Sequence, residues 1–179
     1  PTRRSSDLNL NGTIGSAGGT AGGNIWIYNA NGVVIGANAR ISTGGLLVTT
    51  AAIDRATDSS AGGFLDGSST QFGFTGASSD AGITVRNGAQ ITSHGGAIAL
   101  VSTSVTTEAG SSISAQDGGN VLYGAAAKYK ISFRPTGADD LDLLSFEVAS
   151  GADGTASTAN GGDLLSLSGN TSGNRVFAA

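Results

Sequence analysis

One phrase of this sequence recurs at a nearly constant spacing. Residues 88–100 (GAQITSHGGAIAL) can be set above residues 110–123 (GSSISAQDGGNVLY) so that Ile91 falls on Ile113 and Ile98 falls on Val121. The offsets are 113 − 91 = 22 and 121 − 98 = 23 positions. Other copies of the phrase are placed at Ile41, Gly44, Gly45 and Leu47, at Ile14, Gly22, Gly23, Ile25 and Ile27, and at Ala156, Gly161, Gly162 and Leu164. A period of this length predicts stacked structural repeats.

Each copy consists of an alternating strand, a Gly-Gly corner and a second alternating strand. Alternation at period two places apolar side chains on one face of a strand and polar side chains on the other. Glycine accepts a positive φ at a corner without steric cost, and Asn or Asp accepts it less readily. The corner candidates are Asn31-Gly32, Asn87-Gly88, Asp66-Gly67, Asp117-Gly118 and Asp153-Gly154.

These features predict an all-β fold, a parallel β-solenoid. Dividing 179 residues by a coil of 22 gives about eight coils and a rod of about 40 Å. An antiparallel sandwich is the alternative, since it also uses short strands and glycine-rich turns. The regular spacing and the small inward residues favour the solenoid.

Two stretches depart from the repeat. Residues 55–79 are predicted to leave the coil, with Phe64, Leu65, Phe72 and Phe74 as apolar anchors. Residues 129–148 contain two alternating strands joined by a polar turn, which predicts an antiparallel hairpin laid over the rod. Trp26 and Tyr28 point outward together by strand alternation, and we expect them to pack beneath a covering element rather than to bind sugars.

Composition excludes several classes of protein. Glycine supplies 30 residues without a three-residue period and proline only 2, so collagen and helical bundles are excluded. The nine basic residues are scattered through a chain of net charge −4, so nucleic-acid binding is not expected. The chain has no cysteine, which excludes disulfides, thiolate zinc sites and thiol nucleophiles. No apolar run approaches the roughly 18 residues of a membrane helix.

Few residues suggest chemistry. His94 is the single histidine and is interpreted as an exposed turn residue. Asp139, Asp140 and Asp142 form the densest acidic cluster, which could suit calcium or a glycosidic acid–base pair but is interpreted as a polar hairpin loop. Two glycosylation sequons, at residues 11–13 and 170–172, are of a kind that arises by chance in a chain this rich in Asn, Ser and Thr. We therefore expect no catalytic, cofactor or metal site, and no enzyme activity.

Residues 24–53 carry a family resemblance. The run Asn29-Ala30-Asn31-Gly32-Val33, followed by GANARI at 36–41 and GGLLVTT at 44–50, resembles the filamentous-haemagglutinin N-terminal domain, the secretion domain of two-partner-secretion exoproteins. The order of elements downstream is similar too. Ala30 stands where that family has proline, which removes a preset φ from the turn. The family's upstream half, with its second Asn-Pro-Asn motif, is not found here.

The resemblance implies a right-handed parallel β-helix that heads a large adhesin. It implies recognition in the periplasm by the modules of an outer-membrane β-barrel transporter, with residues 29–33 as the secretion motif, and delivery to the surface or medium of a Gram-negative bacterium. Binding to a host cell or to carbohydrate would belong to the rest of the exoprotein. Residues 1–8 resemble a non-native, adaptor-derived tail, and residues 9–179 are expected to form one domain that is truncated at its N-terminus.

Two other functions stay open at this point. A carbohydrate-active β-helix lyase or hydrolase would use Asp139, Asp140 or Asp142. A purely structural segment of an adhesin shaft would use none of them.

Overall fold

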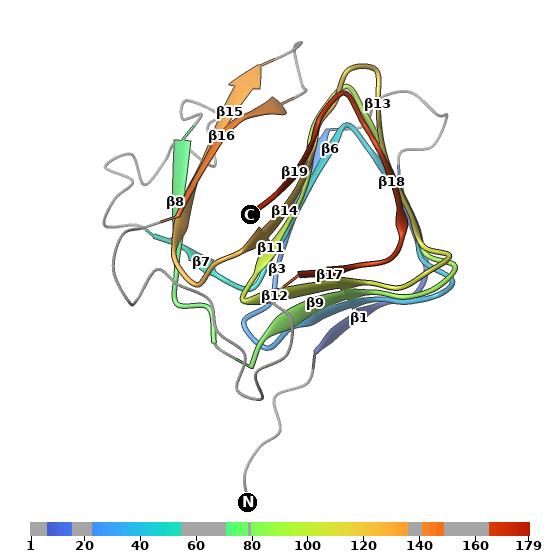
Figure 1. Ribbon diagram of the computed structural model, residues 1–179, viewed down its shortest axis with the longest axis horizontal. Helices are drawn as coiled ribbons and strands as arrows, with labels where there is room; N and C mark the ends of the chain where they lie inside the picture. The colour runs from blue at the N-terminus through green and yellow to red at the C-terminus, as the bar shows by residue number, and fades with distance from the viewer. Residues whose placement is uncertain (1–6, 16–22, 55–70, 79, 136–140, 149–164) are drawn as a thin grey trace, which may run out of the picture.

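Parallel strands stacked around a triangle form the body of the molecule. The computed structural model describes residues 7–15, 23–54, 71–78, 80–135, 141–148 and 165–179. Within these ranges three five-stranded parallel sheets form the sides of a triangular solenoid, and a four-stranded antiparallel sheet lies beside one of them (Figure 1). The described ranges contain no helix suited to crossing a membrane. The parallel β-helix with an added antiparallel hairpin is confirmed, and the sandwich alternative is excluded.

Five successive rungs each contribute one strand to every side. The first side, sheet A, stacks β1 (Leu8–Leu10), β4 (Val33–Ile35), β9 (Gly82–Val85), β12 (Ser104–Thr107) and β17 (Leu165–Leu167). Sheet B stacks β2 (Thr13–Gly15), β5 (Arg40–Thr43), β10 (Gln90–His94), β13 (Ser112–Gln116) and β18 (Asn170–Ser172). Sheet C stacks β3 (Asn24–Tyr28), β6 (Gly45–Thr49), β11 (Ile98–Ser102), β14 (Val121–Ala125) and β19 (Val176–Ala178).

The fourth sheet, sheet D, is built from the stretches that leave the coil. It orders β7 (Ala52–Ile53), β8 (Gln71–Thr75), β15 (Tyr129–Pro135) and β16 (Leu141–Val148) as β16-β15-β8-β7. The predicted hairpin is confirmed, because β15 pairs with β16 antiparallel from Tyr129 opposite Val148. Phe72 and Phe74 are buried as expected, whereas Phe64 and Leu65 lie outside the described residues.

The register confirms most of the repeat and corrects one position. Ile91 pairs with Ile113 and with Ile41, and Ile98 pairs with Val121. The residue opposite Ile98 in the second rung is Leu46, so the placement of Leu47 at that position was wrong. The corner before β6 is two residues shorter than the corner before β11, so the spacing of one rung does not locate the partner of Ile98 in the other. Leu47 lies one position beyond the true partner, and adjacent residues of a strand face opposite sides. The copy predicted at residues 156–164 lies outside the described residues.

The expected number of coils was also wrong. Val33 pairs with Ile83 and Val105 with Leu165, so two of the steps between rungs take far more than 22 residues. The long steps contain the strands of sheet D. Five rungs at about 4.8 Å place the first and last strands about 19 Å apart.

The solenoid encloses a continuous apolar core. Inward side chains from all three sides form columns, and most are fully buried. Those of the middle rungs are Val33, Ile35, Ile41, Leu46, Val48, Ile83, Val85, Ile91, Ile98, Leu100, Val105, Ile113, Val121 and Tyr123. Tyr123 keeps its hydroxyl satisfied inside this core through a 2.6 Å hydrogen bond with the Thr171 hydroxyl of the last rung. The β-branched and leucine side chains fit the pleated inner surface.

Glycines at the corner between sheets B and C let the rungs approach closely. The Gly96 N–H donates to the Gly44 carbonyl at 2.9 Å, and the Asn174 N–H donates to the Gly119 carbonyl at 2.8 Å. A Cβ at Gly96 would lie 2.6 Å from the Gly44 oxygen, and a Cβ at Gly119 would come closer still to the Gly96 oxygen. The repeated Gly-Gly pairs therefore meet a contact requirement as well as a turn requirement.

A second apolar cluster lies between sheet C and sheet D. From the solenoid it takes outward residues such as Leu47, Ala99 and Leu122, and from sheet D it takes Phe72, Phe74, Tyr129, Ile131 and Phe133. Tyr129 is 2% exposed, and its hydroxyl hydrogen-bonds to that of Thr49. Burial raises the pKa of Tyr129, which the Thr49 hydrogen bond offsets only in part.

We expect Gly119→Ala to destabilise the domain by about 1–3 kcal/mol, because its methyl group would press on the Gly96 carbonyl of the rung below. Gly12→Ala is the matched control, since nothing lies within 4 Å of a Cβ there and the change should stay within about 0.5 kcal/mol. Urea unfolding of the two variants checks this. Equal midpoints would contradict the stacking argument.

We expect alkaline pH to weaken the domain through Tyr129. Its folded pKa is raised above the unfolded value of 10.0, so its contribution is complete below that pH and declines as pH rises further. Unfolding free energies at about pH 8 and about pH 11 should differ less in Tyr129→Phe than in the unsubstituted protein. Tyr28→Phe, which removes an exposed phenol, is the control and should leave that difference in place.

Candidate functional site

The predicted secretion motif forms the corner between the first and second rungs. Asn29 follows β3, and Val33 opens β4. The Gly32 N–H donates to the Asn29 carbonyl at 3.3 Å, which closes a four-residue turn. The Asn29 side-chain oxygen accepts the Asn31 N–H at 3.2 Å, so the asparagine mimics a further backbone turn. Sequence and geometry agree that residues 29–32 are a turn.

The last two residues of the motif, Gly32 and Val33, are buried and packed against their neighbours. Gly32 is buried with φ +127°, and a Cβ there would lie 2.9 Å from the Asp7 carboxylate and 3.1 Å from the Gly82 carbonyl. Its carbonyl accepts the Leu8 N–H at 3.0 Å. Val33 is fully buried and faces the solenoid core. Only glycine fits at position 32 without displacing its neighbours.

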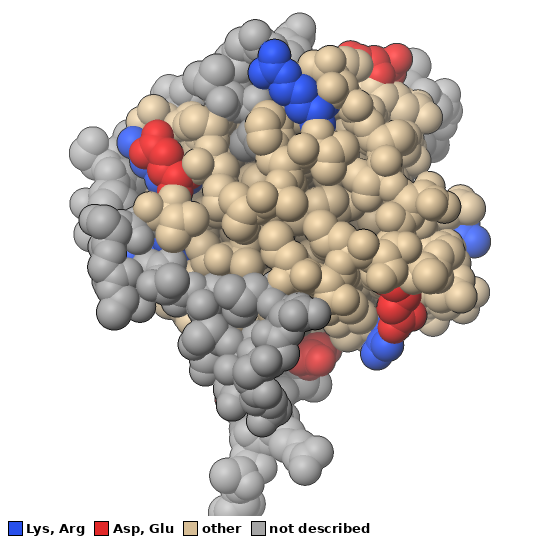
Figure 2. Space-filling view, viewed as in Figure 1, with Lys and Arg blue, Asp and Glu red and all other residues tan. Residues whose placement is uncertain are grey.

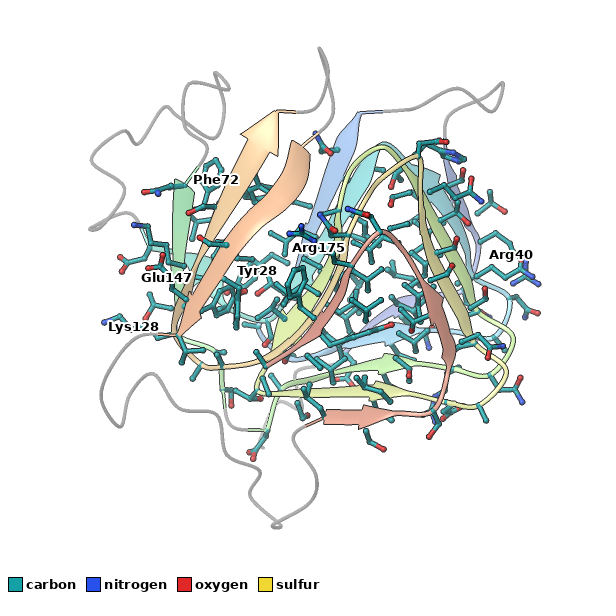
Figure 3. The ribbon with its side chains drawn as sticks, turned by 45° about the horizontal axis from the view of Figure 1, so that its top comes forward. Tyr28, Arg40, Phe72, Lys128, Glu147 and Arg175 are labelled. Carbon is teal, nitrogen blue, oxygen red and sulfur yellow. The ribbon has the colours of Figure 1, made fainter. Side chains whose placement is uncertain are left out.

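The apex of the turn is what a partner can reach. Ala30 and Asn31 are partly exposed, and in the described part of the chain the Asn31 carboxamide makes no hydrogen bond. Tyr28, directly before the turn, is 53% exposed. Figure 3 places Tyr28 and Phe72 on the side of the solenoid that carries sheet D and Arg40 on the opposite side.

The expectation that Tyr28 packs beneath a covering element was wrong. Trp26 is covered as expected, with its ring centroid 4.8 Å from that of Phe72, but Tyr28 is not covered. The available signal was position: Tyr28 is the last residue of its strand and touches the turn, whereas Trp26 lies at the middle of the strand. An exposed tyrosine next to a fixed turn is a common anchor in protein interfaces.

The rest of the family-like run forms the whole second rung. Residues 36–39 make the next corner, where the Ala39 N–H donates to the Gly36 carbonyl at 2.9 Å. The Arg40 guanidinium donates to three carbonyl oxygens, those of Ala37, Ala39 and Gly88, and so joins the second rung to the third. Gly44 and Gly45 then turn the chain into β6. The run therefore contains all three strands of one rung, β4, β5 and β6.

His94 is not the exposed turn residue that was expected. It ends β10, its side chain is 24% exposed, and its Nε2 lies 3.2 Å from the Ser42 hydroxyl. Its Nδ1 lies 3.8 Å from the Asp117 carboxylate, which is too far for a hydrogen bond. This order of Ser, His and Asp resembles a nucleophile with its base. In the described part of the chain, the N–H groups of β5 and β10 form no oxyanion site, because both are inner strands whose N–H groups serve the ladder.

The acidic residues do not gather into a site within the described ranges. Asp142 stands opposite Arg134 in the hairpin, while Asp139 and Asp140 lie outside the described residues. Glu108 accepts the Asn87 N–H at 3.0 Å and pairs with Arg86 at 2.5 Å, and these contacts lower its pKa. Among the described residues no three His, Cys, Asp or Glu side chains are grouped as metal ligands would be. The charges visible in Figure 2 are few, and they form no large patch of one sign.

Fold and corner together define a class of protein: a β-solenoid with a hydrogen-bonded Asn-Gly turn at the corner between its first and second rungs. A family model described as the TPS secretion domain matches residues 3–176 of the 179. The chain therefore belongs to the TPS secretion domain family, as the resemblance of residues 29–50 indicated. Comparison with curated proteins and with solved structures yielded no match.

Family membership gives the chain a role in two-partner secretion. It is the secretion domain of an exoprotein that crosses the outer membrane of a Gram-negative bacterium, and its family partner is an outer-membrane transporter. The family is a secretion and adhesin family and not a known enzyme family.

We expect Ala30→Pro to stabilise the domain by about 0.4–1 kcal/mol. Position 30 is the second residue of the turn that Gly32 and Asn29 close, where proline presets φ and narrows the unfolded ensemble. In the described structure the Ala30 N–H donates no hydrogen bond that proline would remove. Thermal and urea unfolding measure the change. A loss of stability would mean that residues 29–32 hold another conformation.

Proposed function

We propose that this domain directs the export of a larger exoprotein across the outer membrane and that residues 29–33 form part of its signal. The partner is a β-barrel transporter with periplasmic recognition modules, and the product is secreted or held at the cell surface. Membership in the TPS secretion domain family supports the pathway. The fixed turn at the corner between the first and second rungs supports the choice of residues, because it is the one part of the motif with partly exposed side chains.

Recognition at this corner depends on turn shape. Asn29 and Gly32 hold the turn, and Ala30 and Asn31 are presented by it. A preorganised loop loses little conformational entropy when a partner binds, so its contacts contribute more to affinity. Tyr28 adds an exposed aromatic surface beside the turn.

We also propose that the domain nucleates the folding of the rest of the exoprotein outside the cell. In the described residues each side of the solenoid ends in a strand that has a neighbour on one side only, namely β17, β18 and β19. A rung contacts only its neighbours, so a formed rung is a template for the next one.

The experiment compares Asn29→Ala with Asn29→Asp in the intact exoprotein. Alanine removes the side-chain acceptor of the Asn31 N–H, which costs about 1 kcal/mol, whereas aspartate keeps an acceptor. We expect secretion to fall roughly fivefold in Asn29→Ala and to persist in Asn29→Asp. Immunoblots of culture medium against cell fractions measure it.

Far-UV circular dichroism of both purified domains is the folding control. Normal secretion of Asn29→Ala, or equal loss in both variants, would contradict a signal that depends on the shape of this turn.

A further inference from the structure

In a bare solenoid the first and fourth rungs do not touch. Each rung contacts only the rungs directly above and below it, so stability is passed along the stack one interface at a time. Three spacings of about 4.8 Å separate the first rung from the fourth. Such a stack can lose its outer rungs without unfolding its centre.

Sheet D supplies contacts that skip rungs. Trp26 belongs to the first rung, yet its ring centroid lies 5.7 Å from that of Phe133 in the hairpin that comes after the fourth rung. The same indole lies 4.8 Å from the ring of Phe72, nearly edge-on at 87°, and 6.1 Å from the ring of Phe74. The contact between Trp26 and Phe133 joins positions 133 − 26 = 107 residues apart.

The hairpin is fastened to the other rungs as well. The Tyr129 hydroxyl bonds to that of Thr49 in the second rung, and its ring stacks on Phe74 with centroids 4.9 Å apart. Phe146 lies over the fourth rung, where a Cβ on Gly124 would come within 2.9 Å of its ring. One sheet thus holds residues of the first, second and fourth rungs.

The part of sheet D that comes first in the chain depends on the part that comes last. β8 carries Phe72 and Phe74, and its strand neighbours are β7 and β15. Its pairing with β7 involves only Thr75 and Phe74, whereas its pairing with β15 runs from Tyr129 to Ser132. Two short strands alone are marginal in water. β8 therefore needs β15 to stay on the solenoid.

We propose that sheet D is a strap that closes last and converts separate rungs into one cooperative unit. Until β15 and β16 dock, Trp26 lacks the ring that completes its cover, and the first rung is held only by the second. For a chain that emerges N-terminus first, the early rungs stay unlocked until residue 148 is available. That last consequence rests on the proposed function, whereas the strap itself does not.

The chain contains a single tryptophan, which makes the strap directly observable. Trp26 fluorescence reports on the strap, and far-UV circular dichroism reports on the strands of the whole domain. In the unsubstituted full-length chain we expect the two urea transitions to coincide. On refolding, the dichroism signal should recover before the Trp26 signal.

Phe133→Ala tests the strap by removing its contact with the first rung. We expect the Trp26 transition to move to lower urea than the dichroism transition, so that the two separate. Ile113→Val is the matched control: it shortens a buried side chain of the solenoid core, and both transitions should shift together. Phe133→Leu provides a milder substitution if the alanine variant does not fold.

Coincident transitions in both Phe133 variants would overturn the strap, as would Trp26 burial that precedes the recovery of dichroism. Neither outcome bears on secretion, which the Asn29 variants test in the intact exoprotein. A failure of the strap is therefore distinguishable from a failure of the proposed function.

Discussion

The close approach of successive Gly-Gly corners is the constraint on which the rest of this fold depends. At the corner between sheets B and C, the backbone of one rung rests on the carbonyl oxygens of the rung below, with no room for a Cβ at Gly96 or Gly119. This contact brings the strands on either side to hydrogen-bonding distance. It also fixes their register, because a corner that fits in only one position aligns both strands that it joins. The columns of Ile and Val in the core follow from that register.

Burial on both faces of sheet C explains where the strap lies. Strands of sheet B alternate buried and exposed residues, as in β5, whereas every residue of β6 and β11 is buried. Their inner faces line the solenoid and their outer faces lie under the aromatic rings of sheet D. The sequence carries this signal as the unbroken runs Leu46-Leu47-Val48 and Ile98-Ala99-Leu100-Val101, which are typical of strands buried on two sides.

Local patterns therefore predicted the fold class, the hairpin and the covered Trp26. They could not predict the position of Leu47, because corner length varies by two residues between rungs. The inward–outward alternation of one strand does not determine which residues point inward after the corner. They could not give the number of rungs, because chain length alone does not show how many of the 179 residues form 22-residue coils and how many form long excursions. They also missed the neighbours of His94, since Ser42 and Asp117 reach it only through the stacking of three rungs.

The corner at residues 29–33 combines side chains that folding buries with side chains that it leaves partly exposed. Asn29, Gly32 and Val33 are occupied by the turn, the close contact and the core, so their identities follow from folding alone. Folding does not require particular side chains at the exposed positions of the corner. These are the side chains of Ala30 and Asn31 and the exposed ring of Tyr28. Under the proposed function, these three positions and the shape that presents them are the part of the corner that a transporter would contact, whereas the buried remainder of the motif holds that shape.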